Sequence, residues 1–486
     1  MRESCTDRDQ LWERIRRSTI ATELKRVGVE LLVAALETDS GPPCALNAAL
    51  QAAMSEYARR AKPSLRASVE LIRCQTTDDY RPNKALVPVV HRRHCHGYEH
   101  LDALTDIAAE GVRVHLREPL PRQGRWPKNH PSATERIQVL RKNIRKEQDL
   151  FRCIVVDADI AAIWTELVFS PFGVVDKGAG DPRITGCVIH DLSFPEDASI
   201  NSHTDSTAIT TPTYEHCSSI AREILRCKRV KPGCAVKVTA GDVAPAYHNA
   251  CTHSDCVYLF PGRIPEDNAT VIDLCAAFRW TGSAGTYSVL GGAVAFVHGN
   301  SVDANHPAGF FNYDWVDDHV NIEPDVGTRC ADAERSLRYA MAAVMGPRAV
   351  HEDKFIAWRP RQKVLGLMFD TSRETVSIPP DKITKAKRIV SQAYHASRLS
   401  RTMMRSLLGS LRHVATCVRP AQAFLQRLRA GEKNLHRCAH VTITPSMRED
   451  LIWWWHILCD PTINGVRLNF FRHASWPRLC RVHRRV

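Results

Sequence analysis

The chain has 486 residues, of which 44% are hydrophobic and 24% charged, and its formal net charge is +13. This balance is typical of a folded protein with about two to four domains and excludes a disordered chain. No run of roughly 18 uncharged apolar residues occurs, so we expect an intracellular protein, in the cytoplasm or nucleus, that does not engage a membrane. The 17 cysteines lack paired short spacings, which argues against a disulfide framework.

The positive charge is concentrated in the C-terminal part of the chain. Residues 381–486 contain 20 Lys and Arg against 5 Asp and Glu, a surplus of +15, so residues 1–380 sum to about −2. Such a basic field is typical of proteins that bind polyphosphates, because each neutralised phosphate releases condensed counterions. A merely solvated basic surface gives the same count, so the charge alone leaves both interpretations open.

The N-terminal part of the sequence predicts helices. Apolar residues recur at near-helical spacing over residues 11–70, and Gly-Pro-Pro at residues 41–43 breaks the pattern. We therefore expect residues 1–80 to form a helical region, whose role the sequence does not indicate. Residues 81–150 are rich in Pro, His and Arg and predict a linker that leads into a helix over residues 133–149.

Two groups of residues contain the nitrogen and sulfur side chains that zinc favours. They are His94-Cys95-His96 with His100, and His436-Cys438-His440. Neither group has the Cys-x2-Cys half of a zinc finger, so ordinary side chains without metal are the favoured interpretation.

From Phe151 onwards the pattern changes to short apolar runs separated by turn residues. Strands are expected within residues 153–160, 166–177 and 187–195, followed by a helix at residues 214–228.

Residues 234–243 predict a further strand that enters a buried site, because their valines are β-branched and little charge interrupts them. A helix at about residues 270–278 and a Gly-rich segment at residues 282–292 are expected next.

Residues 310–323 predict a hairpin with Asp317 and Asp318 at its turn, since apolar and aromatic residues flank both acids. Two adjacent charges in an apolar hairpin cost several kcal/mol unless a cation compensates them. Asp78-Asp79 is an internal control, because it lies among polar residues where a solvated loop is the better explanation.

The last part of the sequence combines a second hairpin with basic helices. Residues 363–370 and 375–379 predict the hairpin, and Pro379-Pro380-Asp381 predicts the start of a helix. A further helix is expected at residues 401–416. Basic residues occupy the faces opposite the apolar positions of both helices.

The three acids that follow predicted strands are suited to phosphoryl transfer. A nucleotidyl transferase holds two magnesium ions, one at the attacking hydroxyl and one at the leaving pyrophosphate. Asp242 ends one strand and Asp317-Asp318 cap a later hairpin, so one sheet could bring all three together. Magnesium prefers oxygen ligands, which explains why no histidine is required.

Six short segments of the sequence form an ordered set of motifs. They are Ser170-Pro-Phe-Gly-Val-Val-Asp-Lys177, Val188-Ile-His-Asp-Leu-Ser-Phe-Pro195 with Ser199-Ile-Asn201, Gly241-Asp-Val-Ala-Pro-Ala-Tyr247, Trp280-Thr-Gly-Ser283, Trp315-Val-Asp-Asp318 and Leu365-Gly366. They occur in the order of reverse transcriptase motifs, and together they resemble the polymerase domain of retrotransposons. The resemblance is to tyrosine-recombinase-type elements and related elements of oomycete-like genomes, and it runs from about Ser170 to Leu428.

The resemblance implies roles for the acids and for one aromatic residue. Asp242 corresponds to the first-motif metal ligand, and Asp317 and Asp318 correspond to the pair in the YxDD-type hairpin, with Trp315 in place of the usual tyrosine. The implied cofactors are two Mg²⁺ or Mn²⁺ ions. Tyr247 matches the bulky gate beneath the sugar, which implies a deoxynucleotide substrate.

Four further residues correspond to substrate-binding positions of similar enzymes. Lys177 and Arg183 match cations that lie over the triphosphate, Gly282 matches a glycine beside template and nucleotide, and Lys354 matches a general acid near the pyrophosphate. An ordinary surface Lys or Arg and an ordinary turn glycine would give the same pattern.

The resemblance implies an α+β fold of the right-hand polymerase type, with fingers, a ferredoxin-like palm and a helical thumb after a mainly helical N-terminal extension. We expect fingers at residues 151–240, the palm at 241–378, and a basic thumb with a truncated connection at 379–486. The expected function is RNA-directed DNA synthesis for a retrotransposon. The expected partners are an RNA or DNA template with its primer, and deoxynucleoside triphosphates.

Two other functions remain open. Ala284, Arg279 and Pro245 depart from the family pattern, so a decayed retroelement relic that only binds nucleic acid is the main alternative. A two-metal nuclease would leave Tyr247 unexplained. Few acids follow Asp381, and we expect no ribonuclease H, integrase or recombinase within these residues.

Overall fold

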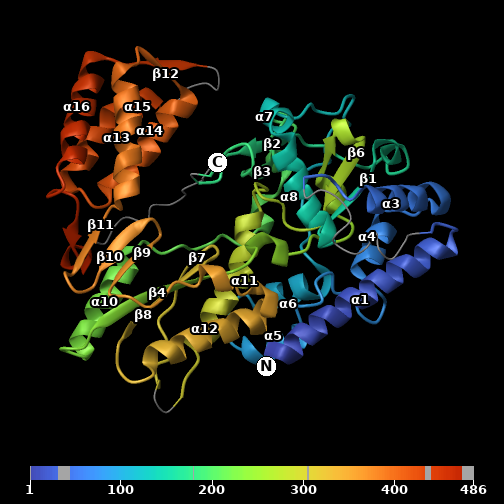
Figure 1. The fold of residues 1–486 in the computed structure, drawn as a ribbon, viewed down its shortest axis with the longest axis horizontal. Coiled ribbons are helices and arrows are strands. Elements are labelled where there is room, and N and C mark those ends of the chain that lie inside the picture. The colour runs from blue at the N-terminus through green and yellow to red at the C-terminus, as the bar shows by residue number, and fades with distance from the viewer. Residues whose placement is uncertain (1, 31–43, 179, 304–305, 433–438, 473–486) are drawn as a thin grey trace.

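The chain is a mixed helical and sheet protein in which small antiparallel sheets are joined and covered by helices (Figure 1). The predicted break at residues 41–43 lies outside the described part of the chain, as do His436 and Cys438. No described helix is long and apolar enough to cross a membrane. The computed structural model describes residues 2–30, 44–178, 180–303, 306–432 and 439–472.

The N-terminal region is helical, as the apolar spacing predicted. Leu24, Met54 and Val69 of its first three described helices share a buried core with Trp164 and Ile272. Helices at residues 131–135 and 137–149 cover the helix that was predicted over residues 133–149, but two further helices, at residues 88–94 and 101–110, lie within the predicted linker. The helices of this part are α1 (Arg2–Arg26), α3 (Ala48–Ala61), α4 (Leu65–Arg73), α5 (Pro88–His94), α6 (Leu101–Glu110), α7 (Pro131–Glu135) and α8 (Ile137–Asp149).

A three-stranded sheet of order β1-β6-β5 and a separate hairpin, β2-β3, follow. The helix predicted at residues 270–278 is wrong, because β6 occupies Ala269–Asp273 and pairs with both neighbours. Consecutive β-branched residues that are buried on both sides favour this strand over a helix. The strands are β1 (Cys153–Asp157), β2 (Phe172–Val175), β3 (Cys187–His190), β5 (Pro261–Ile264) and β6; a short helix, α9 (Ile200–His203), follows β3.

The central sheet has the order β4-β8-β7 and lies between two layers of helices. Ile224 of α10 packs with Val238 and Ile322 on one face, while on the other face His298 of α11 contacts Asn321. The predicted strand and the predicted Asp-Asp hairpin are both confirmed. The elements are α10 (Ser218–Val230), β4 (Val236–Asp242), α11 (Ser283–Gly299), β7 (Tyr313–Trp315), β8 (Asp318–Pro324) and α12 (Arg329–Met345).

Most of the Gly-rich segment at residues 282–292 is helical, because Gly282 is the N-cap of α11 and the helix begins at Ser283. Its glycines allow neighbours to approach the helix closely. A Cβ atom on Gly285 would lie 2.2 Å from the carbonyl oxygen of Thr210, and one on Gly292 would lie 2.5 Å from the hydroxyl of Tyr98. Packing at these positions outweighs the low helix propensity of glycine.

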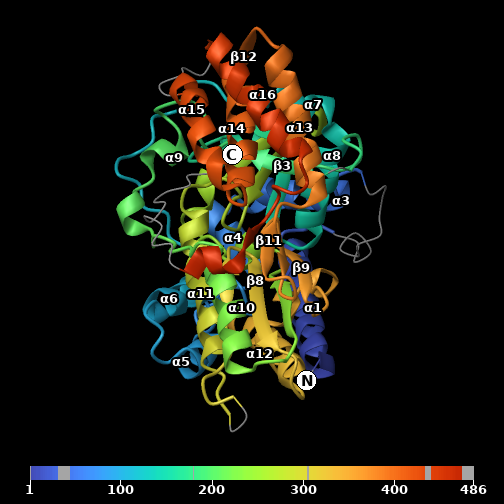
Figure 2. The ribbon, with the colours of Figure 1, turned by 90° about the vertical axis from the view of Figure 1, so that its left-hand side faces the viewer.

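The C-terminal helices form a bundle that Figure 1 shows on the other side of the molecule from the β1-β6 sheet, with β4 and β8 of the central sheet below the bundle. Figure 2, from the side, shows the same bundle above the strands β8, β9 and β11. The two helices predicted after residue 379 are confirmed. The elements are α13 (Pro380–His395), β12 (Arg398–Ser400), α14 (Arg401–Ala415), α15 (Gln426–Glu432), β13 (His440–Thr442) and α16 (Pro445–Cys459).

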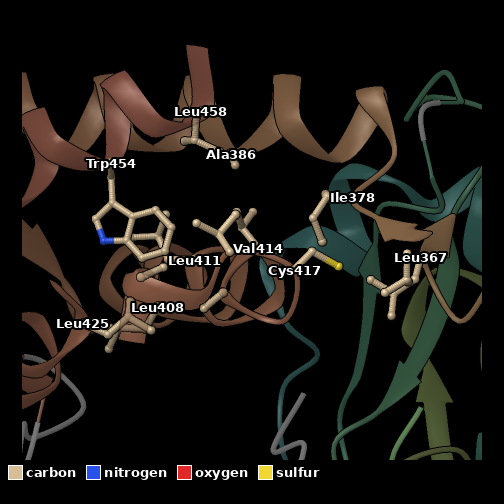
Figure 3. Packing of buried hydrophobic residues seen from close by; sticks show 14 of the residues in the cluster. Leu367, Ile378, Ala386, Leu408, Leu411, Val414, Cys417, Leu425, Trp454 and Leu458 are labelled. Atoms are coloured by element: carbon tan, nitrogen blue, oxygen red, sulfur yellow. The ribbon is translucent and has the colours of Figure 1, made fainter. Parts of the chain in front are cut away.

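Buried apolar side chains hold the bundle together and join it to an adjoining sheet. Leu411 and Trp454 lie in the bundle core, and Ile378 and Leu367 continue this core towards the strands (Figure 3). Residues 363–370, predicted as one arm of a hairpin, form a hairpin themselves. The sheet has the order β14-β11-β10-β9 and consists of β9 (Arg361–Val364), β10 (Leu367–Asp370), β11 (Thr375–Ser377) and β14 (Val466–Arg467).

The strand pairing crosses the predicted subdomain boundaries. β5 and β6 lie within the range predicted for the palm, residues 241–378, but pair with β1 of the predicted fingers. The boundary at residue 240 falls inside β4, which begins at Val236. The assignment of fingers, palm and thumb stays a prediction.

Candidate active site

The central sheet places two of the predicted acids directly opposite each other. In the antiparallel pairing of β4 with β8, Asp242 is the partner of Asp318. Directly opposed residues point to the same face of a sheet, and their Cα atoms lie about 4.5–5.5 Å apart. The two carboxylates therefore continue the face on which Val238 and Ile322 are buried, at the end where both strands meet the turn.

The hairpin turn brings the third acid to the same end of the sheet. Val316 has a φ of 55° and turns the chain between β7 and β8, which places Asp317 in the turn. The carbonyl of Asp317 accepts a hydrogen bond of 2.9 Å from the backbone N–H of Val243, just beyond β4. Asp242, Asp317 and Asp318 thus converge from two strands and one turn.

The acids repel one another in a partly buried setting. Burial raises the pKa of Asp317, and the charge of Asp242 raises it further. Burial also raises the pKa of Asp318 to about 6, with contributions from Asp317 and Asp242. Like charges in a poorly solvated site disfavour full ionisation unless a cation is added.

Lys354 supplies one cation. Its Nζ atom lies 3.0 Å and 2.8 Å from the two carboxylate oxygens of Asp242. The lysine ends a short helix, η7 (Glu352–Lys354), and the preceding His351 donates its backbone N–H to the carbonyl of Asp242 at 3.1 Å. Burial lowers the pKa of Lys354, but the hydrogen bond to Asp242 and the negative charges of Asp242, Asp317 and Asp318 together outweigh burial, so the net pKa is raised.

The chemistry of the donors suits a magnesium ion, whereas their present arrangement is not closed around one. Carboxylate oxygens are the ligands that Mg²⁺ prefers, and Lys354 forms an ion pair with one of the three acids, Asp242. Among the residues that the structure describes, no group of three or more His, Cys, Asp or Glu side chains is arranged to hold a metal ion. The amine of Lys354 occupies the carboxylate of Asp242, so it would have to move away before that carboxylate could bind a metal ion. The two-metal assignment stays a prediction.

Aromatic side chains line the site next to the acids. Tyr247 lies in the short helix η3 (Ala246–Asn249) that follows β4, and its ring contacts Tyr287 edge-on at 5.8 Å between centroids. The ring of Phe278 is tilted against that of Tyr247, with 6.1 Å between the ring centroids. Burial raises the pKa of Tyr247, and the negative charge of Asp317 raises it further. The predicted gate therefore borders the acid cluster.

The other predicted substrate-binding residues are not joined to the acids by any contact in the described part of the chain. Lys177 and Arg183 are exposed on the connection between β2 and β3. Gly282 precedes α11, and a Cβ atom there would lie 2.4 Å from the ring of Trp280. The close ring accounts for the glycine without a substrate, so the roles of these three residues stay predictions.

Several residues beside the acids were missed in the sequence. Tyr287 is buried, its hydroxyl has no hydrogen-bond partner among the described residues, and the charges of Asp317 and Asp242 act on it. The ring of Tyr214 contacts that of Trp315 in a tilted arrangement, with 4.8 Å between the ring centroids. Helical spacing from Ser283 could have placed Tyr287 on a buried face, had the Gly-rich segment been interpreted as a helix.

Two residues of the first group considered for zinc contact or pack against neighbouring side chains. Cys95 is buried and His94 contacts Tyr339 edge-on at 5.7 Å. Within the described residues, no cluster of three or more His, Cys, Asp or Glu side chains at this group is arranged to hold a metal ion. The second group lies largely outside the described residues.

No protein-family model matches this chain, and no curated protein matches it. Solved structures similar to it include a foamy viral protease-reverse transcriptase bound to an RNA/DNA hybrid, with a TM-score of 0.49, 12% identity and coverage of 75% of this chain and 43% of that chain. A second, the same kind of protein with double-stranded DNA, has a TM-score of 0.47, 13% identity and coverage of 77% and 72%.

A third, a foamy viral protease-reverse transcriptase dRH in complex with double-stranded DNA, has a TM-score of 0.45, 12% identity and coverage of 74% of this chain and 56% of that chain. The chain thus spans about half the length of two of these three foamy viral chains.

Proposed function

We propose that this chain is an RNA-directed DNA polymerase of a retrotransposon. The observation that carries the proposal is the convergence of Asp242, Asp317 and Asp318 at one end of one sheet, with Asp242 and Asp318 in direct register. These acids are also the ones that the order of reverse transcriptase-like motifs singles out. Lys354 and Tyr247, two of the predicted substrate-binding residues, border the same cluster.

The proposed reaction adds a deoxynucleotide to the 3′-hydroxyl of a primer. Bound Mg²⁺ or Mn²⁺ ions would activate that hydroxyl and compensate the charge of the leaving pyrophosphate. Asp242, Asp317 and Asp318 would hold the ions. Lys354 would leave Asp242 and donate its proton to the pyrophosphate as the α-phosphate bond breaks.

The sugar would be selected by Tyr247. Its ring is held between Phe278 and Tyr287, so it cannot easily rotate away from a bulky substituent. A ribose 2′-hydroxyl against this ring would be rejected sterically. Lys177 and Arg183 would reach the triphosphate from the exposed β2-β3 connection.

Template and primer would lie along the C-terminal bundle. The exposed cations of α13 and α14 include Lys385, Arg388, Arg405 and Arg412. Such side chains neutralise phosphates without reading sequence, which suits an enzyme that must copy any template.

A second function is favoured by one observation. Because the described residues hold no ready-made metal group and Lys354 already pairs with Asp242, a relic that only binds nucleic acid fits the structure as well. A primer-extension assay with Mg²⁺ or Mn²⁺ separates the two. Incorporation of deoxynucleotides that Asp317→Asn abolishes supports the polymerase, whereas binding without incorporation by the intact protein contradicts it. Shortening of the primer would instead indicate a nuclease.

A further inference from the structure

Side chains of α12 contact the segment on either side of Lys354 and hold it in place. Arg338 lies 2.9 Å from Glu334 on its own helix, and it also pairs with Glu352 at the start of η7. Its guanidinium lies 3.8 Å from the ring centre of Phe355, directly after Lys354. We call Arg338, Glu334, Glu352 and Phe355 the α12 clamp.

The clamp presses this segment onto β4. A Cβ atom on Gly241 would lie 2.5 Å from the ring of Phe355, so the ring rests on the strand where only glycine leaves room. Beyond it, Ile356 donates its backbone N–H to the carbonyl of Ala240 at 3.1 Å. Trp358 donates its indole N–H to Glu334 of the clamp at 3.2 Å. The backbone on both sides of Lys354 is therefore fixed to the strand that carries Asp242.

We infer that Arg338 is a positioning residue that keeps the Lys354 amine at the carboxylate cluster. The Lys354 side chain is 52% exposed, so few contacts of its own restrain it. A flexible lysine loses rotamer freedom when it is held in one place, and a fixed backbone reduces the number of positions it can otherwise reach. The catalytic consequence of this inference rests on the proposed function, whereas the placement of Lys354 does not.

Lysine acylation tests the placement directly. The folded protein is treated with a limiting N-hydroxysuccinimide acetate, and peptide mapping compares Lys354 with the exposed Lys177. Arg338→Ala should raise the relative acylation of Lys354 several-fold, as Asp242→Asn should, because an amine released from its carboxylate reacts faster. Arg338→Lys keeps the charge but loses the planar stack, so it should give an intermediate value.

Unchanged acylation of Lys354 in folded Arg338→Ala would overturn the inference. If that variant does not fold, Glu352→Gln removes one clamp ion pair and should produce the same change in smaller measure. Unchanged acylation in folded Glu352→Gln would then count equally against the clamp.

Primer extension tests the catalytic consequence. Arg338→Ala should lower kcat with little change in the KM for the deoxynucleotide, and it should cause no further loss in a Lys354→Ala background. Full additivity of the two substitutions would show that Arg338 acts in some other way. Absence of extension by the unaltered protein would defeat the proposed function, while the acylation result would still decide the role of the clamp.

An independent feature is a pair of cysteines that face each other, one four residues after Tyr247 and the other two residues after the end of β6. The Sγ atoms of Cys251 and Cys275 lie 3.8 Å apart, and the two residues form an antiparallel bridge. Two backbone hydrogen bonds flank the pair, from Thr252 N to Leu274 O at 2.9 Å and from Ala276 N to Ala250 O at 2.8 Å. Residues that face each other without a backbone hydrogen bond between them in an antiparallel pairing have Cα atoms about 4.5 Å apart, and this distance is within the range that a disulfide spans.

The surroundings distinguish the two thiols. A hydrogen bond from Cys275 lowers the pKa of Cys251, burial opposes this, and the guanidinium groups of Arg73 and Arg152 lower it again. The same contact and burial raise the pKa of Cys275. Cys251 is partly exposed, whereas Cys275 is buried. Thiolates in such cationic, accessible settings are the reactive form of cysteine.

We propose that Cys251 and Cys275 form a disulfide when the protein meets a peroxide. The Cys251 thiolate attacks one peroxide oxygen, so an S–O bond forms, the O–O bond breaks and hydroxide leaves. Cys275 then attacks this sulfur, an S–S bond forms, the S–O bond breaks, and the second oxygen leaves as water with the Cys275 proton. Two thiols are oxidised, and one peroxide is reduced to two waters. The bond would tie the segment after Tyr247 to the end of β6.

Peroxide treatment of the intact protein tests this proposal. Dilute hydrogen peroxide, followed by alkylation and non-reducing peptide mapping, should yield one peptide pair that links Cys251 to Cys275 and that dithiothreitol separates. Cys251→Ser should leave Cys275 open to alkylation after unfolding. Cys459, which is exposed, serves as the reference for unassisted oxidation. If Cys459 is oxidised while both members of the pair are still fully alkylated, the proposal is wrong.

Discussion

Two Asp-Asp dipeptides in this chain have opposite electrostatics. Asp79 lies 2.8 Å from Arg81 and 3.2 Å from Lys84. Burial raises its pKa, but these cations outweigh burial and lower the pKa to about 2. At Asp318, burial and the neighbouring acids act together and raise the pKa to about 6.

The first pair differs in part from the solvated loop that was predicted for it, and the second pair has the shortage of positive charge that a cation site requires. Asp78 is exposed, as the polar surroundings of the first pair indicated, but Asp79 is half-buried and ion-paired rather than solvated. Arg81 and Lys84 follow within five residues, so this charge is satisfied by its own loop. At the second pair, Lys354 forms an ion pair with Asp242, and the charges of Asp317 and Asp318 also act on it. An acid that the chain neutralises is structural, whereas acids left short of cations are suited to hold added ones.

The largest expected difference between the two pairs is in activity. Asp317→Asn should reduce the rate of primer extension by about a thousandfold or more, which corresponds to about 4 kcal/mol in the activation barrier. The substitution removes a carboxylate that is proposed to bind the divalent cations needed for catalysis. Asp78→Asn should leave extension unchanged. Steady-state incorporation of deoxynucleotides measures both variants. Comparable losses in the two variants would erase the distinction.

The aromatic neighbour of the second pair gives the next prediction. Tyr247→Ala opens space beside the acids, so ribonucleotides should be incorporated about tenfold to a hundredfold better relative to deoxynucleotides. The ratio of kcat/KM for the two substrates measures this. Tyr339→Ala serves as the control, since that ring contacts His94 and not the acids. An unchanged ratio in Tyr247→Ala would show that Tyr247 does not select between deoxynucleotides and ribonucleotides.

The raised pKa of Asp318 predicts that this acid destabilises the fold when it is ionised. Because its folded pKa lies above the unfolded value, the folded state binds the proton more tightly, and stability falls as the pH rises from about 4 to about 6. Asp318→Asn should therefore stabilise the protein at pH 7 by about 1–2 kcal/mol after solvent screening, with no gain near pH 3. Urea unfolding at both pH values measures the change. A loss of stability at pH 7 would contradict the assigned repulsion.

The first pair should show the reverse sign with a smaller effect. The pKa of Asp79 is lowered in the folded state, so its contribution is present above about pH 4 and is lost as the pH falls towards 2. Asp79→Asn should destabilise the protein at pH 7 by about 1 kcal/mol, and the difference should shrink on acidification. The same unfolding experiment gives the result. A stabilising Asp79→Asn would show that its ion pairs do not offset burial.

The local elements with strong patterns could be predicted from the sequence. The valines of β4, the flanks of the Asp317-Asp318 turn and the apolar faces after residue 379 each match one period of secondary structure. Residues 270–278 could not be assigned correctly, because a short apolar run does not distinguish a buried strand from a helix. The strand was decided by its pairing partners, which lie far away in the chain.

The site could be predicted only in part for the same reason. Three acids after predicted strands indicated convergence, and the register of Asp242 with Asp318 agrees. The pairing of Lys354 with Asp242, the clamp around Arg338 and the ring of Tyr287 depend on how α11 and α12 pack. No local pattern encodes those contacts.

The central claim is that Asp242, Asp317 and Asp318 bind divalent cations, and Mn²⁺ binding followed by electron paramagnetic resonance tests it most directly. The protein is titrated with Mn²⁺ in the presence of a primer-template and a deoxynucleotide, and Asp317→Asn is compared with Asp78→Asn. The account predicts that Asp317→Asn loses bound Mn²⁺ while Asp78→Asn binds as the unaltered protein does. Equal binding by all three proteins would contradict it.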